Sequence, residues 1–439
     1  MPDSTDGTPL PAAFPEGWRT KTLAEIASIH GGGTPSRQVP AYWGGTIPWV
    51  TPGEVTGHPT KYLTKTQDRI TKAGLASSSA TLLPVDSLLL TTRASLGAAV
   101  LSGVPIATNQ GFQSLVFGTS TNPHFFYHLV PRLEAELTRR ASGTTFLEIS
   151  GRELAKVEVP LPALSEQRRI AEILDTVDEA IQRTEELISK LEEMKKGLLH
   201  DLLTCGIDEN GELRDPERHP EQFKDSPLGR IPSEWDCHRL GELASLQGGF
   251  AFPSDIFGSG PVPVVRMSDL RGERLDTSNA ARISATYLRT HASVALREGD
   301  LVIGMSGSLD NLAVVGGHDL PALLNQRVGR FIIENQGALK YRMLDLFVSS
   351  EFYQRQLRQE AAGAAQLNIS SQQVEDTVVP KPPLAEQERL LCHWEALKSR
   401  IRTETTQLEK IRSLKQALMN DLLTGQVRVN VPEPEEATA

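Results

Sequence analysis

A long heptad-patterned stretch occurs twice in this sequence and limits what the chain can fold into. The first copy runs from Ser165 to Thr204 and the second from Ala385 to Thr424. Apolar residues recur at spacings of three and four in both copies, a pattern typical of a long helix that buries one narrow seam against a partner helix. The expected seam positions are Ile170, Ile173, Val177, Leu187, Leu191, Leu198, Leu390, Trp394, Leu397, Ile401, Leu408, Ile411, Leu414 and Leu418.

The two copies share their register from end to end. Glu166-Gln167 opens the first and Glu386-Gln387 the second, and each copy closes on the same Asp-Leu-Leu-Thr sequence. Helices of about 39 residues would each be ~58 Å long at a rise of ~1.5 Å per residue. Because seam length and register agree, we predict that the two helices pair with each other. The alternative is that each helix packs separately on its own globular neighbour.

The segments before the two helices are also repeated. Trp18–Ile29 is similar to Trp235–Leu246, and glycine pairs follow both. Short apolar runs between Gly and Pro turns predict β-rich globular units with irregular loops. The ends of the two units match better than their middles, as expected for a shared scaffold whose central loops carry specificity. The predicted organisation is a disordered N-terminus (1–15), a first unit (16–160), a helix (161–205), a linker (206–231), a second unit (232–380), a helix (381–426) and a loose tail (427–439).

Composition excludes several classes of protein. No apolar run approaches the length of a membrane span. The three cysteines lie far apart in the sequence and predict neither a disulfide framework nor a metal site, which fits a reducing cytosol. The net charge of −10 argues against a simple polyanion binder. Basic residues nevertheless exceed acidic ones between Trp18 and Ser120. Arginine-rich loops on a globular unit are suited to DNA, although ordinary surface arginines would look the same.

A search for catalytic motifs finds none that is convincing. Gly31–Arg37 lacks the spacing and the lysine of a Walker loop, and no histidine pair has the spacing of zinc ligands. Asn122-Pro123-His124-Phe125 lacks the second proline of an amino-methyltransferase motif. Asp208–Glu212 has incomplete calcium-loop spacing, so a hairpin or linker is the preferred interpretation. We therefore expect no catalytic residue and no metal ligand in this chain.

Taken together, the motifs resemble those of a known family, the specificity subunits of type I restriction–modification enzymes. The first unit carries the resemblance in Gly31–Arg37, Ile47–Val50, Thr91–Gly97 and Thr108–Phe112. The helices carry it at their proline-flanked starts, around Glu166-Gln167 and Glu386-Gln387, and at their Asp-Leu-Leu-Thr ends. Each motif alone is weak, but the duplicated set covers nearly the whole chain in the family's order.

The resemblance implies an α/β (α+β) fold. Two tandem target recognition domains would be separated by an antiparallel coiled coil of the two long helices, with pseudo-twofold symmetry. It also implies a non-catalytic, cytoplasmic, bacterial DNA-binding subunit. Each domain would read one half of a bipartite double-stranded target, and the coiled coil would set the spacer. Two modification subunits would supply S-adenosylmethionine and adenine methylation, and restriction subunits would add ATP- and Mg²⁺-dependent translocation and cleavage.

On this interpretation, loop residues of both units are the candidate DNA contacts. They are Thr34, Ser36, Arg37, Lys61, Thr92, Arg93, Ser95, Asn109, Gln110, Arg266, Arg271, Ser306, Ser308, Asn325, Gln326 and Arg327. The pairs Asn109-Gln110 and Asn325-Gln326 could equally be buried and stabilise turns. The glycine loop of the second unit lacks the arginine of the first, so the half-sites should differ. Alternative functions are a methyltransferase-only system, a self-sufficient methyltransferase-nuclease, or an assembly adaptor that does not read DNA.

Overall fold

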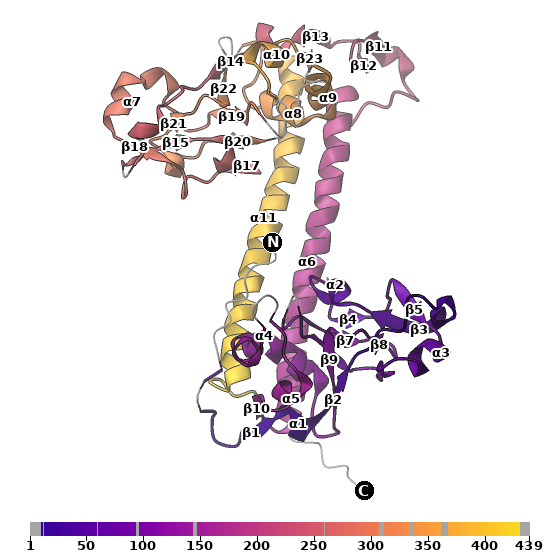
Figure 1. Ribbon diagram of the computed structural model, residues 1–439. Coiled ribbons are helices and arrows are strands. Elements are labelled where there is room, and N and C mark those ends of the chain that lie inside the picture. The colour runs from indigo at the N-terminus through magenta and orange to yellow at the C-terminus, as the bar shows by residue number, and fades with distance from the viewer. Residues whose placement is uncertain are drawn as a thin grey trace. The chain divides into compact units, whose positions relative to one another are not determined.

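The protein consists of two compact units, shown as a computed structural model in Figure 1. The structure describes residues 10–11, 13–58, 60–93, 96–143, 147–258, 260–306, 311–333, 337–360 and 368–430. Unit 1 comprises Met1–Glu185 with Thr406–Ala439, and unit 2 comprises Glu186–Thr405. Each unit therefore contains one globular part, the first half of one long helix and the last half of the other. Most of 1–15 and 427–439 lies outside the described residues.

The globular part of unit 1 is built on two sheets. A five-stranded sheet has the order β2-β9-β6-β7-β4, a three-stranded sheet has the order β5-β3-β8, and β1 pairs with β10. The strands are β1 (Arg19–Thr22), β2 (Ala27–Gly31), β3 (Trp43–Val50), β4 (Tyr62–Leu63), β5 (Asp68–Ile70), β6 (Leu88–Thr91), β7 (Ala99–Ser102), β8 (Ala107–Thr108), β9 (Phe112–Phe117) and β10 (Glu158–Leu161). The helices are α1 (Leu23–Ile26), α2 (Pro52–Val55), α3 (Lys72–Ala76), α4 (Pro123–Arg140) and α5 (Gly151–Leu154).

The globular part of unit 2 repeats this topology with one more strand in its larger sheet. The orders are β14-β22-β19-β20-β17-β16 and β18-β15-β21, and β13 pairs with β23. These strands are β13 (Asp236–Arg239), β14 (Ser245–Gly248), β15 (Val262–Val265), β16 (Leu270–Arg271), β17 (Glu273–Leu275), β18 (Arg282–Ile283), β19 (Leu301–Gly304), β20 (Leu312–Val314), β21 (Leu323–Leu324), β22 (Val328–Ile332) and β23 (Val378–Lys381). Its helices are α7 (Thr286–Thr290), α8 (Met343–Ser349), α9 (Glu351–Glu360) and α10 (Ser371–Glu375).

The segment 206–231, predicted as a linker, is folded into unit 2. It contains the hairpin of β11 (Phe223–Ser226) and β12 (Gly229–Pro232). Ile207 and Ile231 are fully buried in the main hydrophobic core of that unit. The charged, proline-rich composition of the segment hid these two buried positions from the sequence analysis.

The two heptad-patterned stretches form the predicted long helices, α6 (Leu164–Thr204) and α11 (Leu384–Thr424). In unit 1 they run antiparallel, since Asp178 pairs with Lys415 at 2.5 Å and Glu185 pairs with Arg412 at 2.7 Å. The α6 residue number rises between these pairs while the α11 number falls. No described helix contains an apolar stretch that could cross a bilayer.

The helices are also antiparallel within unit 2. The Lys195 ammonium of α6 lies 5.8 Å from the ring centroid of Trp394 on α11, and Ile207, beyond the end of α6, donates its backbone N–H to Glu386 near the start of α11. Leu199, Leu202 and Leu203 share one core with Leu390 and Trp394. The hydrophobic contacts of the helix ends therefore belong to the same cores as the globular parts.

Two of the predicted seam positions lie on the exposed side of their helices. Leu414 is 53% exposed and Leu187 is 37% exposed. A straight helix has 3.6 residues per turn, so a strict heptad stripe drifts by about 20° per repeat around its surface. Next to Leu414, Lys415 turns toward α6 to meet Asp178, which leaves the leucine facing outward.

A buried glutamate near the start of each long helix is held by the chain that follows the other helix. In unit 1, Glu166 accepts two hydrogen bonds from Arg428, at 2.6 and 2.9 Å, and one from the Trp18 indole at 3.1 Å. Arg428 lies just beyond the end of α11. We call these three residues the unit 1 clamp.

The unit 2 clamp consists of Glu386, Arg214 and Trp235. Arg214, which follows α6, donates to Glu386 at 2.5 and 3.2 Å, and the Trp235 indole donates at 2.9 Å. Both glutamates come from the Glu-Gln motif that opens the helices. The motif is repeated because each copy ties the start of one helix to the end of the other.

The glutamine of the same motif attaches the globular part to the helix. Gln167 is fully buried, accepts the Asn122 N–H at 2.8 Å and donates to the Pro162 carbonyl at 2.8 Å. Gln387 makes the same two bonds in unit 2, with Lys340 N–H at 2.8 Å and Pro382 carbonyl at 2.9 Å. In each unit, one buried side-chain amide thus forms hydrogen bonds with backbone groups on both sides of the junction between the globular part and the helix.

We predict that Arg214→Ala destabilises the protein much more than Arg428→Ala. The Arg214 and Glu386 side chains are 11% and 2% exposed, so removing the arginine leaves a buried carboxylate without its cation, a loss of about 3 kcal/mol. Arg428 is 48% exposed, and water can replace it. Guanidinium unfolding of both variants measures the difference, and Arg183→Ala, in an exposed pair, is the control. Equal losses for the two clamp variants would contradict the prediction.

Candidate nucleic-acid interface

The glycine loop after β2 in unit 1 depends on close backbone approaches. A Cβ on Gly33 would lie 2.4 Å from the Ala80 nitrogen, and one on Gly32 would lie 1.7 Å from the Asn109 carbonyl oxygen. Only glycine fits either position. The tight path leaves the side chains of Thr34, Ser36 and Arg37 exposed, and the Thr34 hydroxyl donates a hydrogen bond to the exposed Gln110.

Arg37 is oriented by an aromatic ring and a carboxylate. Its guanidinium carbon lies 3.7 Å from the Trp43 ring centroid, and its Nη2 donates to Asp68 at 2.6 Å. Trp43 in turn packs edge-on against the buried Trp49, whose indole donates to the Gly33 carbonyl at 2.9 Å. The side chain remains 57% exposed. A stacked, partly open guanidinium is suited to bidentate contacts with a guanine edge or a phosphate.

Several predicted DNA contacts of unit 1 are instead buried or paired with other residues of the fold. Thr92 is buried and donates to the Gly111 carbonyl at 3.1 Å, and Asn109 accepts the Gly111 N–H at 2.8 Å, which is the turn-stabilising role. Lys61 is only 15% exposed because it is paired with Asp175. Arg93 is half-exposed and pairs with Glu148 at 2.8 Å. Ser95 lies outside the described residues.

Unit 2 makes the equivalent loop with different side chains. A Cβ on Gly249 would lie 2.2 Å from the Asn325 carbonyl oxygen, so the same close approach recurs. Gln326 and Arg327 follow Asn325 and are exposed, and Arg327 donates to Asn368 at 3.4 Å. The remaining predicted residues flank this group: Arg266 lies over the Phe257 ring at 4.6 Å, Arg271 is exposed, and the Ser306 hydroxyl is 2.7 Å from the Met267 sulfur. Ser308 lies outside the described residues.

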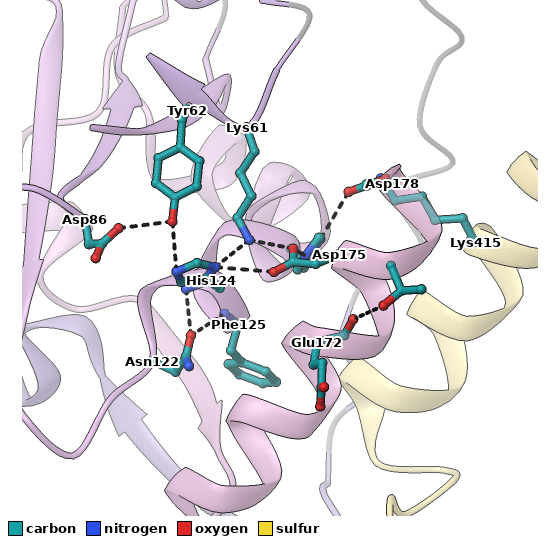
Figure 2. A network of polar contacts seen from close by, with 12 residues as sticks. Lys61, Tyr62, Asp86, Asn122, His124, Phe125, Glu172, Asp175, Asp178 and Lys415 are labelled. Carbon is teal, nitrogen blue, oxygen red and sulfur yellow. Dashed lines mark hydrogen bonds and ion pairs between the residues drawn. The ribbon is translucent and has the colours of Figure 1, made fainter. Parts of the chain in front are cut away.

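A polar network joins the globular part of unit 1 to both long helices (Figure 2). Asp175 of α6 accepts from Lys61 at 2.5 Å and from His128 at 2.7 Å, and lies 3.3 Å from His124 Nδ1. One turn further along α6, Asp178 pairs with Lys415 of α11. The network therefore holds the globular part, α6 and α11 together within one unit.

The network shifts the pKa values of its members. Burial alone would raise the pKa of Asp175, but hydrogen bonds from His124, His128 and Lys61 lower it well below its usual range. Burial lowers the pKa of Lys61 despite the opposing effect of Asp175. Burial also lowers the pKa of His128, and the charge of Lys61 acts in the same direction. We infer an ionised Asp175 that is bound by the Lys61 ammonium and by a neutral His128 imidazole.

Unit 2 makes the same joint without histidine. Arg342 pairs with Glu395 of α11. Lys398 of α11 pairs with Asp345 of α8 at 2.6 Å, and both side chains are almost fully buried. The Trp394 indole also donates to Asp345, at 3.2 Å. Among the described residues of the whole chain, no three His, Cys, Asp or Glu side chains gather as metal ligands.

Comparison with known proteins gives the family. A family model for the type I restriction modification DNA specificity domain matches residues 15–193 and again residues 232–416. The two matches together span most of the sequence. The chain belongs to this family of specificity subunits.

Individual specificity subunits are similar over long stretches. The MjaIX specificity subunit of Methanocaldococcus jannaschii is 25% identical over 424 residues, which is 95% of each chain. The MjaVIII specificity subunit of the same organism is 27% identical over 310 residues, 70% of each chain.

Two solved structures share the fold. The type I restriction–modification specificity subunit of M. genitalium has a TM-score of 0.54 at 16% identity, covering 95% of this chain and 98% of that one. A chain from a study of complex assembly and conformational transition in the type I system has a TM-score of 0.56 at 18% identity, covering 95% and 100%. The predicted fold of two tandem domains and long helices is confirmed.

Some of the residues that shape this specificity subunit were missed from the sequence. Trp43 and Asp68, which orient Arg37, lie on different strands and become neighbours only through the pairing of β3 with β5. His124 and His128 lie one turn apart on α4, but Asp175 follows them by dozens of residues. A signal was available for Asp175, because Ile173, Leu174 and Val177 close to it in the heptad-patterned stretch indicate partial burial.

We predict that His128→Leu reduces the acid sensitivity of unit 1. The folded unit holds a neutral imidazole, whereas the unfolded chain binds a proton near the ordinary histidine pKa of about 6.5. Unfolding therefore takes up a proton below that pH, and stability falls as the pH drops through it. Leu346 is fully buried at the matching position of unit 2, since it lies six residues after Lys340 as His128 lies six residues after Asn122. This makes leucine a natural replacement.

The measurement is the unfolding temperature of both proteins between about pH 7.5 and about pH 5. The wild-type value should fall more steeply than that of the variant. A wild-type protein that becomes more stable relative to the variant as the pH falls would show that Asp175 and Asp178 hold His128 protonated.

Proposed function

We propose that this chain supplies the DNA address of a type I restriction–modification complex and performs no catalytic step itself. Each globular part reads one half of a bipartite double-stranded target. The observation that carries the proposal is the repeated glycine loop with the segment packed beside it. Together they expose Thr34, Ser36, Arg37 and Gln110 in unit 1 and Gln326 with Arg327 in unit 2. Both loops are held by the same close backbone approach, so the scaffold is shared and the exposed chemistry differs.

Partner subunits would supply the chemistry. In this proposal two modification subunits dock on the long helices and bring S-adenosylmethionine for adenine methylation. Restriction subunits would bring ATP- and Mg²⁺-dependent translocation and cleavage. A shallow depression of about 260 Å³ on α6, lined by residues such as Arg168, Glu172 and Glu179, offers charges of both signs for such docking. A methyltransferase-only system would use this chain in the same way.

The long helices are proposed to set the spacer of the target. Each helix is continuous over 41 residues, about 60 Å at ~1.5 Å per residue. Half-sites one DNA turn apart are separated by about 34–36 Å, a span that a rigid helix pair can control. An assembly adaptor without DNA readout is the second function, and sequence-blind binding by the assembled complex would favour it.

The proposal is tested by replacing one exposed glutamine at a time with alanine. Gln110→Ala should relax the base preference in one half-site only, and Gln326→Ala in the other half-site only, because each lies on a different globular part. The loss of one bidentate base contact corresponds to about tenfold weaker discrimination. Methylated adenines are sequenced in host DNA that carries each variant with its modification partner.

Buried Thr92 provides a matched control, since Thr92→Val keeps the shape of the side chain but removes its hydroxyl, which faces Gly111 rather than solvent. Relaxation in both half-sites by either glutamine variant would contradict separate reading. If both variants kept the wild-type target sequence, these loops would not be part of the DNA interface.

A further inference from the structure

The two glycine loops differ at one matched position. Gly33 N–H donates to the Thr108 carbonyl at 2.9 Å in unit 1, and Phe250 N–H donates to the Leu324 carbonyl at 2.9 Å in unit 2. Thr108 ends β8, and Leu324 ends β21 in the matching three-stranded sheet. A side chain on Gly33 would collide with Ala80, whereas Phe250 carries a ring that is 42% exposed.

The Phe250 ring is supported from within its own unit. Its centroid lies 4.4 Å from that of His291 and 5.0 Å from that of Phe252, both at steep angles. Phe252 is itself buried in the hydrophobic core beneath the loop. The ring is therefore held in place before any ligand arrives, and little side-chain entropy is lost when it makes a contact.

Polar side chains surround this apolar ring. The Phe250 carbonyl accepts the Gln326 N–H at 3.1 Å, and the Gln326 and Arg327 side chains are exposed beside it. Phe250 therefore belongs to the same surface as the candidate DNA contacts of unit 2. An isolated apolar group among hydrogen-bonding groups suits a ligand edge that presents a methyl group next to donors and acceptors.

Among the four base pairs, only those with thymine present a methyl group in the major groove. Insertion between base pairs is a poorer fit, because a wedge must be free on both faces, and more than half of the Phe250 surface is covered. Building on the proposed DNA recognition, we propose that Phe250 contacts a thymine methyl group in the half-site read by unit 2 and specifies thymine there.

The experiment uses the chain assembled with its modification partner, on duplexes that contain the target mapped by methylation sequencing. Each thymine of the unit 2 half-site is replaced in turn by deoxyuridine, which lacks only the methyl group. The wild-type complex should bind about fourfold more weakly at one position, the value for one buried methyl group. Phe250→Ala should bind both duplexes equally, and Phe250→Leu should keep part of the preference.

Leu82→Ala is the matched control, because Leu82 is 45% exposed and lies on unit 1. It should retain the full preference for thymine. A fourfold preference that persists in Phe250→Ala, or a unit 2 half-site without a methyl-dependent position, would overturn the assignment while sequence-specific binding remained intact. A wild-type complex that binds its target no better than a scrambled duplex would instead refute both the assignment and the proposed function.

Discussion

A buried carboxylate near the start of each long helix organises this protein. Glu166 and Glu386 are 4% and 1% exposed, and burying a carboxylate is costly unless hydrogen-bond donors meet it. The donors come from two directions: a tryptophan of the adjoining globular part and an arginine from the segment beyond the other helix. Each unit is therefore complete only when the start of one helix meets the end of the other. This reciprocal requirement explains why the pairing is antiparallel.

In both units, polar side chains join the globular part to the helices at matching positions, but the residue types differ between the two units. Unit 1 uses His124, His128 and Lys61 around Asp175, and unit 2 uses Arg342 with Glu395 and Lys398 with Asp345. Buried ion pairs add little net stability compared with apolar residues, but removing one partner is costly. We infer that these joints fix the orientation of each globular part on its helices, which a purely apolar contact would leave less well defined.

Much of this architecture could be predicted from sequence because it is periodic and repeated. The heptad stripes predicted both helices, and the duplicated Glu-Gln and Asp-Leu-Leu-Thr motifs predicted their common register. Leu187 and Leu414 were assigned to the seam because a heptad count does not include the drift of a 3.6-residue helix. The partners of the clamp glutamates could not be predicted, since Arg214 and Arg428 lie in irregular segments with no periodicity. Thr92 and Lys61 resembled surface residues by type, and only the fold shows that they are enclosed.

The central proposal is that the two long helices, paired within each unit, set the distance between the half-sites. The most direct measurement inserts one heptad into α6 between Glu185 and Glu186 and another into α11 between Thr405 and Thr406, followed by methylation sequencing. The account predicts the same half-sites with a spacer longer by about three base pairs, since seven residues add ~10.5 Å of helix. An insertion into one helix alone should abolish specific methylation, because the clamps can then no longer close together. An unchanged spacer in the doubly extended protein would contradict the account.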